Sequence, residues 1–295
     1  MSIGMFDGLH LGHRAIIDQA RALAGPGGRV VIVTFEPAPA AILNPSQIMP
    51  RLMTADQRTQ ALLQAGVDEV VTLESTKALL QMSPVEFIEE MIDRIQPDHV
   101  IEGGDFRFGV ARSGDLDLLR SEGERLGFRV HETREIEATL PDGSSIQARS
   151  SIVRKMLVEG RVEEAACLLA RPWRVEAQVI KGHQRGREIG CPTANLDLGE
   201  LVYPADGVYA GTALLESGDR YMAAISIGTN PTFNDGAPSF EVHLLDYKGR
   251  IGEYGWTLKV DLQHRLRDQV VYESIDELVE AIDGDLDRIR SLLSV

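Results

Sequence analysis

Hydrophobic residues are arranged differently in the two halves of this chain. In the first half, short apolar runs such as Arg29–Phe35 alternate with amphipathic stretches such as Leu11–Leu23, which has the spacing of a helix. Glycines and a proline at 25–28 mark the end of that helix. Strands that alternate with helices are typical of a parallel sheet, so the sequence predicts a Rossmann-like α/β domain.

The rest of the first half continues this alternation. Met1–Ile3 has only the length of the last part of a strand, so we expect the first strand to be truncated. Further elements are expected as strands at 99–102 and 128–131, a helix at 113–126 closed by Gly127, and one or two helices at 151–169 with a break at Gly160.

From Arg174 onward, apolar and polar positions alternate one by one. Three segments have this period of two, and their apolar faces are formed by Val175, Ala177 and Val179, by Phe240, Val242 and Leu244, and by Leu258, Val260 and Leu262. The period predicts half-buried antiparallel strands in a small all-β barrel. Apolar residues spaced by three and four along 275–293 predict a terminal amphipathic helix. We expect a boundary near Arg171–Trp173, with domains at 1–171 and 172–295.

Composition narrows the class of protein. A net charge of −15 over 295 residues argues against a nucleic-acid-coating protein, because phosphate backbones are bound by clustered Lys and Arg. No segment approaches the run of about 20 apolar residues that spans a membrane. Cys167 and Cys191 lack a C-x-x-C spacing and no secretory signal is evident, so we expect a cytoplasmic protein. The sequence does not determine whether it forms a homo-oligomer.

A first candidate site lies where the first strand passes into the first helix. His10 and His13 flank Gly12 in the first helical turn, where free N–H groups and the helix dipole favour an anion such as a triphosphate. Glycine leaves room for a phosphate to approach the backbone. Two histidines three residues apart are also found as zinc ligands or as plain surface residues.

A segment far downstream favours the nucleotide interpretation. Ser150, Ser151 and Arg154 begin another predicted helix, where hydroxyl and amide groups can hold a leaving pyrophosphate and the arginine can neutralise developing charge. A zinc site has no use for such a segment.

The second half has a candidate site of its own. Gly182, Gly186 and Gly190, with Arg187 between them, form a glycine-spaced basic loop whose amides can face phosphate oxygens. The side chains of Thr193 and Asn195 offer oxygen ligands suited to Mg²⁺. Glycine-rich loops also simply join strands. Glu241, on the polar face of its strand, is either a base pointing into a cleft or a solvated residue.

The candidate segments form a series of motifs that follow one another along the chain. The first half contains G-x-F-D-G-x-H-x-G-H from Gly4, T-F-E-P from Thr34, G-D-F-R-F-G from Gly104 and S-S-x-x-R from Ser150. The second half contains G-x-x-x-G-R-x-x-G-x-P-T-A-N-L from Gly182, G-V-Y-A from Gly207, I-G-T-N-P-T-F from Ile227 and E-V-H-L-L from Glu241. Along essentially its whole length, the chain resembles bacterial bifunctional riboflavin kinase/FAD synthetases.

The resemblance implies two activities, both using ATP. In the first, FMN attacks the α-phosphorus of ATP, with His10 and His13 stabilising the α-phosphate and the departing pyrophosphate. In the second, Thr193 and Asn195 bind Mg²⁺ and ATP phosphates, and Glu241 is the base toward the ribityl 5′-hydroxyl of riboflavin. The further residues that the resemblance assigns to nucleotide or flavin binding are Gly4, Phe6, Asp7, Asp105, Phe106, Phe108, Gly109 and Tyr209.

Four positions depart from the family pattern. Met5 stands where the family commonly has Asn and Ala38 where it has His. Arg149 stands where Ser is typical, and Ser151 where Thr is. An impaired first half would leave a single-activity riboflavin kinase.

The alternatives are a single adenylyltransferase whose barrel only binds ligand and a flavin-binding regulator without catalysis. The candidate base Glu241 and the candidate metal ligands Thr193 and Asn195 argue against the regulator, which needs neither. Arg265 and Arg267 are expected either to close over a ligand or to be surface residues.

Overall fold

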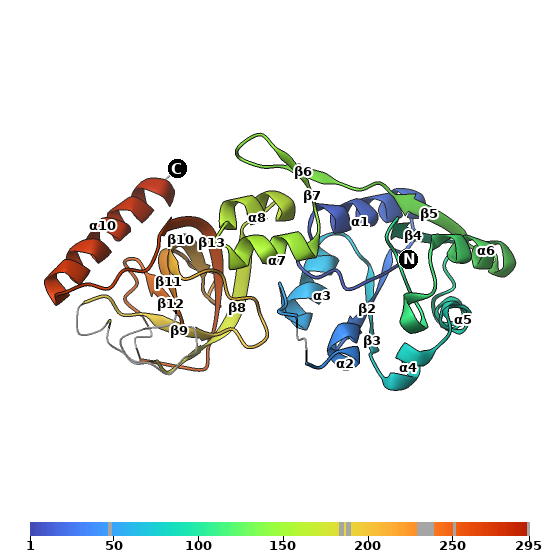
Figure 1. Cartoon of the computed structure of the whole chain (residues 1–295), viewed down its shortest axis with the longest axis horizontal. Coiled ribbons are helices and arrows are strands. Elements are labelled where there is room, and N and C mark those ends of the chain that lie inside the picture. The colour runs from blue at the N-terminus through green and yellow to red at the C-terminus, as the bar shows by residue number, and fades with distance from the viewer. Residues whose placement is uncertain (47–48, 183–185, 187–189, 229–238, 250–251, 294–295) are drawn as a thin grey trace. The chain divides into compact units, whose positions relative to one another are not determined.

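The computed structural model describes residues 1–46, 49–182, 186, 190–228, 239–249 and 252–293 (Figure 1). Contacts within the chain divide it into two compact units. The first contains residues 1–50, 55–138 and 145–149, and the second contains residues 51–54, 139–144 and 150–295.

A parallel sheet forms the centre of the first unit. Its strands are β1 (Ser2–Ile3), β2 (Val31–Glu36), β3 (Glu69–Glu74), β4 (His99–Gly103) and β5 (Arg129–Thr133). Strand β2 pairs in parallel with both β1 and β3, and β4 pairs in parallel with β5. The N–H of Ile101 donates to the carbonyl of Met1 at 2.9 Å, so β4 follows β1 in the order β3-β2-β1-β4-β5. The predicted α/β fold is confirmed.

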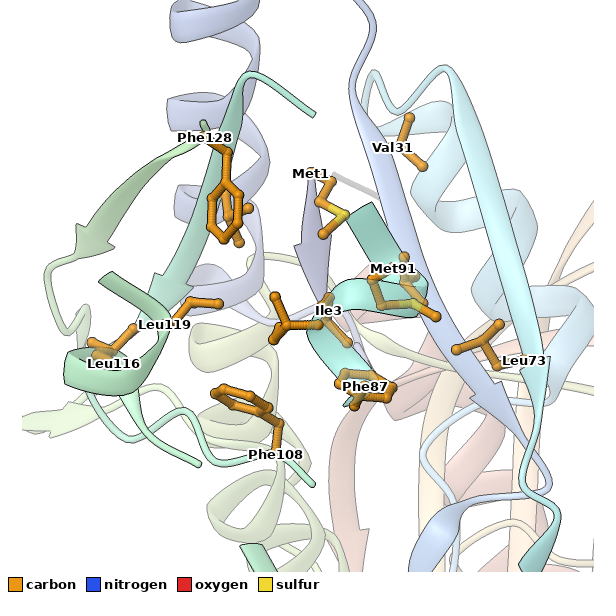
Figure 2. Close-up of a cluster of buried hydrophobic side chains, with 13 residues drawn as sticks. Met1, Ile3, Val31, Leu73, Phe87, Met91, Phe108, Leu116, Leu119 and Phe128 are labelled. Carbon is orange, nitrogen blue, oxygen red and sulfur yellow. The ribbon is translucent and has the colours of Figure 1, made fainter. Parts of the chain in front are cut away.

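Helices cover both faces of this sheet. They are α1 (Leu11–Ala24), α2 (Pro39–Leu43), α3 (Ala55–Gln64), α4 (Lys77–Gln81), α5 (Pro84–Ile95), a 3-10 turn at Val110–Arg112 and α6 (Leu116–Leu126). Val31 and Val33 of β2 face the cluster that contains α5 and α6, which Figure 2 shows. The alternate residues Val30 and Ile32 pack with α1 and α3 instead. This alternation explains why the strand is apolar throughout.

One predicted helix begins later than expected. The helix expected from Ser113 starts at Leu116, because the carboxylate of Asp115 accepts a hydrogen bond from the N–H of Leu118 at 3.0 Å and caps it. Gly127 ends the helix as predicted, with a φ of 88°.

The second unit is built on a closed antiparallel barrel, as predicted. Its strands are β8 (Trp173–Ile180), β9 (Ala194–Asp197), β10 (Gly207–Leu214), β11 (Arg220–Gly228), β12 (Ser239–Leu244) and β13 (Thr257–Arg267). They follow each other around the barrel in the order β10-β11-β12-β9-β8-β13. The apolar residues expected on one face of β8, β12 and β13 are buried.

Two helices lead into the barrel. Helix α7 (Ser150–Val158) accepts a hydrogen bond at its Leu157 carbonyl from the N–H of Ala205, and α8 (Val162–Leu169) follows after the predicted break. The domain boundary expected near residue 171 stays a prediction. The compact units defined by contacts change between Arg149 and Ser150, so α7 and α8 belong to the barrel unit.

The terminal helix α10 (Ile275–Leu293) is amphipathic as predicted, but its apolar face is unevenly covered. Ile289 is buried with Leu245 and Leu266, whereas Ile275 is 68% exposed. Strands β6 (Glu137–Thr139) and β7 (Ser145–Gln147) form a separate two-stranded sheet. Within the described residues, no helix has the length and apolarity that a membrane crossing requires.

Candidate functional site

The first candidate site lies at the carboxyl edge of the parallel sheet. The loop at 4–10 follows β1, and the loop at 104–109 follows the neighbouring β4. Strand order reverses between these two strands, because β2 continues the sheet on one side of β1 and β4 on the other. Crevices at such points are where doubly wound sheets bind ligands.

His10 and His13 lie together in the first turn of α1. His10 is the N-cap residue, and its Nδ1 accepts a hydrogen bond from the N–H of His13 at 3.4 Å. The two imidazole rings stack, with centroids 3.6 Å apart and an interplanar angle of 20°. The ring centroid of Phe6 lies 4.9 Å from that of His13. Stacked rings, one of them engaged in capping, do not converge on one metal ion, so this arrangement disfavours a zinc pair.

The loop before this turn has a constrained backbone. Phe6 and Leu9 are buried and have positive φ values of 48° and 45°. Such conformations cost energy for residues with a Cβ and are concentrated at functional sites. A Cβ at Gly12 would lie 3.1 Å from Cε1 of His10 and 3.3 Å from the carbonyl oxygen of Ala148. The protein itself therefore gives residue 12 a reason to be glycine, besides the expected approach of a phosphate.

The loop at 104–109 is fixed at its far end. Phe108 is buried and exchanges backbone hydrogen bonds of 3.1 and 2.9 Å with Gly114, and its ring stacks on Phe106. A Cβ on Gly109 would lie 2.7 Å from Pro84. Asp105, at the near end, is exposed. The predicted residues Gly4, Asp7 and Asp105 thus lie in the two loops of this edge.

Ser150, Ser151 and Arg154 begin α7, as expected for residues of a helix N-terminus. They belong to the second unit, whereas both histidines belong to the first. Their predicted role in binding pyrophosphate stays a prediction.

The second candidate site is a pocket in the barrel unit. Gly182, Thr193 and Asn195 are among its lining residues. The hydroxyl of Thr193 donates to Oε2 of Glu241 at 3.0 Å, and Asn195 is the cross-strand partner of Glu241. Strand β9 lies directly beside β12, which brings these polar residues together. Their role as one site stays a prediction.

Two glycines of the adjoining loop have close neighbours. A Cβ on Gly182 would lie 2.2 Å from Nδ2 of Asn195 and would displace that amide, and a Cβ on Gly186 would lie 2.2 Å from the carbonyl oxygen of Cys191. The carbonyl of Gly186 accepts a hydrogen bond from the N–H of Cys191 at 2.7 Å, and Gly190 has a φ of 78°. Arg187 lies outside the described residues.

Other polar groups of the barrel are engaged with the protein. Tyr209 is fully buried and its hydroxyl donates to the carbonyl of Ala205 at 2.6 Å, which gives it a role in the core; its predicted ligand contact stays a prediction. Arg267 holds Asp285 of α10 through two nitrogens, and Arg265 pairs with Asp268. Burial, together with nearby carboxylates, raises the pKa of Cys191 to about 11, which makes it a poor nucleophile.

Aromatic residues of the pocket were missed by the sequence reasoning. Tyr247, Tyr254 and Trp256 line it together with Thr193 and Asn195. Their signal in the sequence is a run of aromatic residues interleaved with glycines at 247–256. Rings of this kind supply apolar surface suited to a planar ligand.

The chemistry of the polar groups fits Mg²⁺ better than a transition metal. Among the residues that the structure describes, no group of three or more His, Cys, Asp and Glu side chains is placed to hold an ion. A hydroxyl that donates to Glu241 keeps its lone pairs for a cation. Thr193 and Asn195 are hard oxygen donors, and Mg²⁺ is commonly held by few protein ligands, with waters and substrate phosphates as the others.

Two family models match the chain. One is described as FAD synthetase and matches residues 1–147, and the other is described as riboflavin kinase and matches residues 169–293.

Full-length relatives carry both descriptions in one name. Bifunctional riboflavin kinase/FMN adenylyltransferase of Pseudomonas fluorescens is 34% identical over 99% of this chain and 92% of its own length. The Escherichia coli K12 protein of the same name is 32% identical over 97% of this chain and 90% of its own length. A Streptococcus pneumoniae crystal structure titled as a macrolide-efflux protein superposes with a TM-score of 0.86, at 29% identity over 98% of this chain and 93% of that one.

Proposed function

This chain belongs to the family of bifunctional riboflavin kinase/FMN adenylyltransferases, and we propose that it converts riboflavin to FMN and then FMN to FAD. It contains both an FAD synthetase domain and a riboflavin kinase domain, and it is a transferase. Each step consumes one ATP, the first releasing ADP and the second releasing pyrophosphate. The observation that carries the proposal is the hydrogen bond from Thr193 to Glu241, the cross-strand partner of Asn195; Thr193 and Asn195 both line the barrel pocket.

In the kinase step, Glu241 accepts the proton of the riboflavin 5′-hydroxyl as that oxygen attacks the γ-phosphorus of ATP. Thr193 and Asn195 would hold Mg²⁺, which when bound neutralises charge on the transferring phosphates. The Thr193 hydroxyl orients the Glu241 carboxylate, and Asn195 is kept in place against Gly182. Positioning contributes more than the base, because phosphoryl transfer passes through a loose transition state.

In the adenylyl step, a phosphate oxygen of FMN attacks the α-phosphorus of ATP, and the bond to the β-phosphate breaks. His10 and His13 stabilise the charge on the α-phosphate and the leaving group, supported by the N–H groups of the first turn of α1. Ser150, Ser151 and Arg154 hold the departing pyrophosphate. The support for this step is the stacked histidine pair at the reversal point of the sheet.

The proposal places the enzyme in the cytoplasm. Its support is that Cys167 and Cys191 are both free thiols, as in proteins of a reducing compartment.

Product analysis tests the proposal. Pure protein is incubated with riboflavin, ATP and Mg²⁺, and the flavins are separated by chromatography over time. We expect FMN to rise first and FAD to follow. FMN without FAD would show a riboflavin kinase with an inactive first half, and bound riboflavin without any product would show a flavin-binding regulator.

A further inference from the structure

Arg149 joins three separate side chains near the first candidate site. Its Nη1 lies 3.3 Å from Oδ2 of Asp105, its Nη2 donates to Oε1 of Glu135 at 2.9 Å, and its Nε donates to Oε1 of Gln147 at 2.5 Å. All four residues belong to the first unit. A planar guanidinium with all three nitrogens engaged is held in one orientation.

The backbone next to Arg149 packs on the histidine turn. The carbonyl oxygen of Ala148 lies 3.3 Å from the point that a Cβ of Gly12 would occupy, and the N–H of Ala148 donates to the carbonyl of Ile136 at 2.8 Å. Asp105 lies two residues beyond β4. Arg149 therefore connects the segment beside the first turn of α1 to the loop at 104–109.

Arg149 contacts the first part of the loop at 104–109, which is not buried in the core. Phe108 is anchored by its burial and by Gly114, whereas Gly104 and Asp105 are exposed. Asp105 is held by its ion pair with Arg149. Because both partners are substantially exposed, the pair adds little to folding stability, so its effect is on position and local charge.

We propose that Arg149 is a positioning residue for adenylyl transfer, which fixes Asp105 and offsets two carboxylates beside the polyphosphate site. This inference rests on the proposed function. Asp105 and Glu135 are both negative, and without Arg149 they would repel the phosphates of ATP and FMN. Arg149 lowers that repulsion and holds Asp105 in one position through their ion pair.

The test compares four variants by FMN adenylylation. The riboflavin kinase rate of the same preparation measures the amount of protein, and thermal unfolding followed by circular dichroism measures whether the first unit is folded. Arg149→Ala is expected to raise KM for ATP by about tenfold at low salt, with a smaller change at high salt because screening weakens the repulsion. Arg149→Lys, which keeps the charge but loses the fork, should fall between. In the double variant Arg149→Ala/Glu135→Gln, KM should partly recover.

The matched control is Arg125→Ala. Arg125 also bridges two carboxylates, Glu89 and Glu122. It lies in the last turn of α6, before the start of β5, whereas the candidate site follows the carboxyl ends of β1 and β4. An unchanged KM in Arg149→Ala, or an equal change in Arg125→Ala, would overturn the inference. If wild-type protein made no FAD, the proposed function would fail, and calorimetric ATP affinity of the same variants would then decide the role of Arg149.

Discussion

Thr193 and Glu241 are far apart in sequence and meet only because two strands pair. The spacing of 48 residues gives no geometric information by itself, and the resemblance of the P-T-A-N and E-V-H-L-L segments to a family is what linked them. The hydrogen bond explains why a hydroxyl residue stands at 193. It orients the carboxylate without neutralising it.

Substitutions at this pair separate chemistry from binding. We expect Glu241→Gln to lower the kinase kcat by about 100-fold with little change in KM for ATP, since the lost group acts as a base. Thr193→Ala and Asn195→Ala should abolish kinase turnover, because they remove the oxygen donors for Mg²⁺. Steady-state kinetics of each variant measures this, and FMN adenylylation in the same preparations is the control. Kinase rates at the wild-type level in all three would remove the site assignment.

Several residue contacts had no signal in the sequence. Arg149 was noted as a departure from a pattern, but its partners Asp105 and Glu135 lie 44 and 14 residues away. The burial of Tyr209 in the barrel core could not be foreseen either, because a tyrosine in an alternating strand is found on either face.

At the scale of elements, the spacing of hydrophobic residues correctly predicted which faces of the barrel strands are buried. The alternation in β12 predicted which side chains are buried, since Phe240, Val242 and Leu244 are all buried and Glu241 is not. The period did not determine where helices begin, since the N-cap Asp115 delays the start of α6. It also did not determine burial in α10, where the apolar spacing predicts a longer buried face than the helix has. Propensity alone does not tell which face finds a partner.

Strand β4 carries a buried carboxyl group that gives a pH prediction. Glu102 accepts a hydrogen bond from the N–H of Ile3 at 2.7 Å, and burial raises its pKa well above the ordinary value. A carboxyl with a raised pKa in the folded state stabilises it below the unfolded pKa of about 4.3, and that contribution is lost as pH rises through the folded value. Deprotonation therefore destabilises this sheet.

Glu102→Gln keeps the acceptor and cannot ionise. Its Tm should exceed that of the wild type at pH 8 by several degrees, at roughly 2–4 °C per kcal/mol, and the gain should shrink toward pH 5. Thermal unfolding followed by circular dichroism across this range measures the difference. Glu86→Gln is the control, because hydrogen bonds from Ser83 lower the pKa of Glu86 and it should gain nothing at high pH. A pH-independent difference for Glu102→Gln would contradict the account.

At the scale of the whole molecule, the change of pattern near residue 174 predicted two architectures correctly. The match to the FAD synthetase model ends at residue 147 and the match to the riboflavin kinase model begins at residue 169, so neither model covers residues 148–168. Helices α7 and α8 occupy that interval, and their contacts are with the barrel unit. Sequence period could not assign them, since an amphipathic helix packs equally well on a sheet or on a barrel.

The central claim is that one chain breaks ATP at two different bonds. Parallel reactions of riboflavin with ATP labelled at the γ- or the α-phosphorus test it most directly. The account predicts γ-label in both FMN and FAD, and α-label in FAD but not in FMN. Flavin products that carry no α-label, or FMN that carries no γ-label, would contradict it.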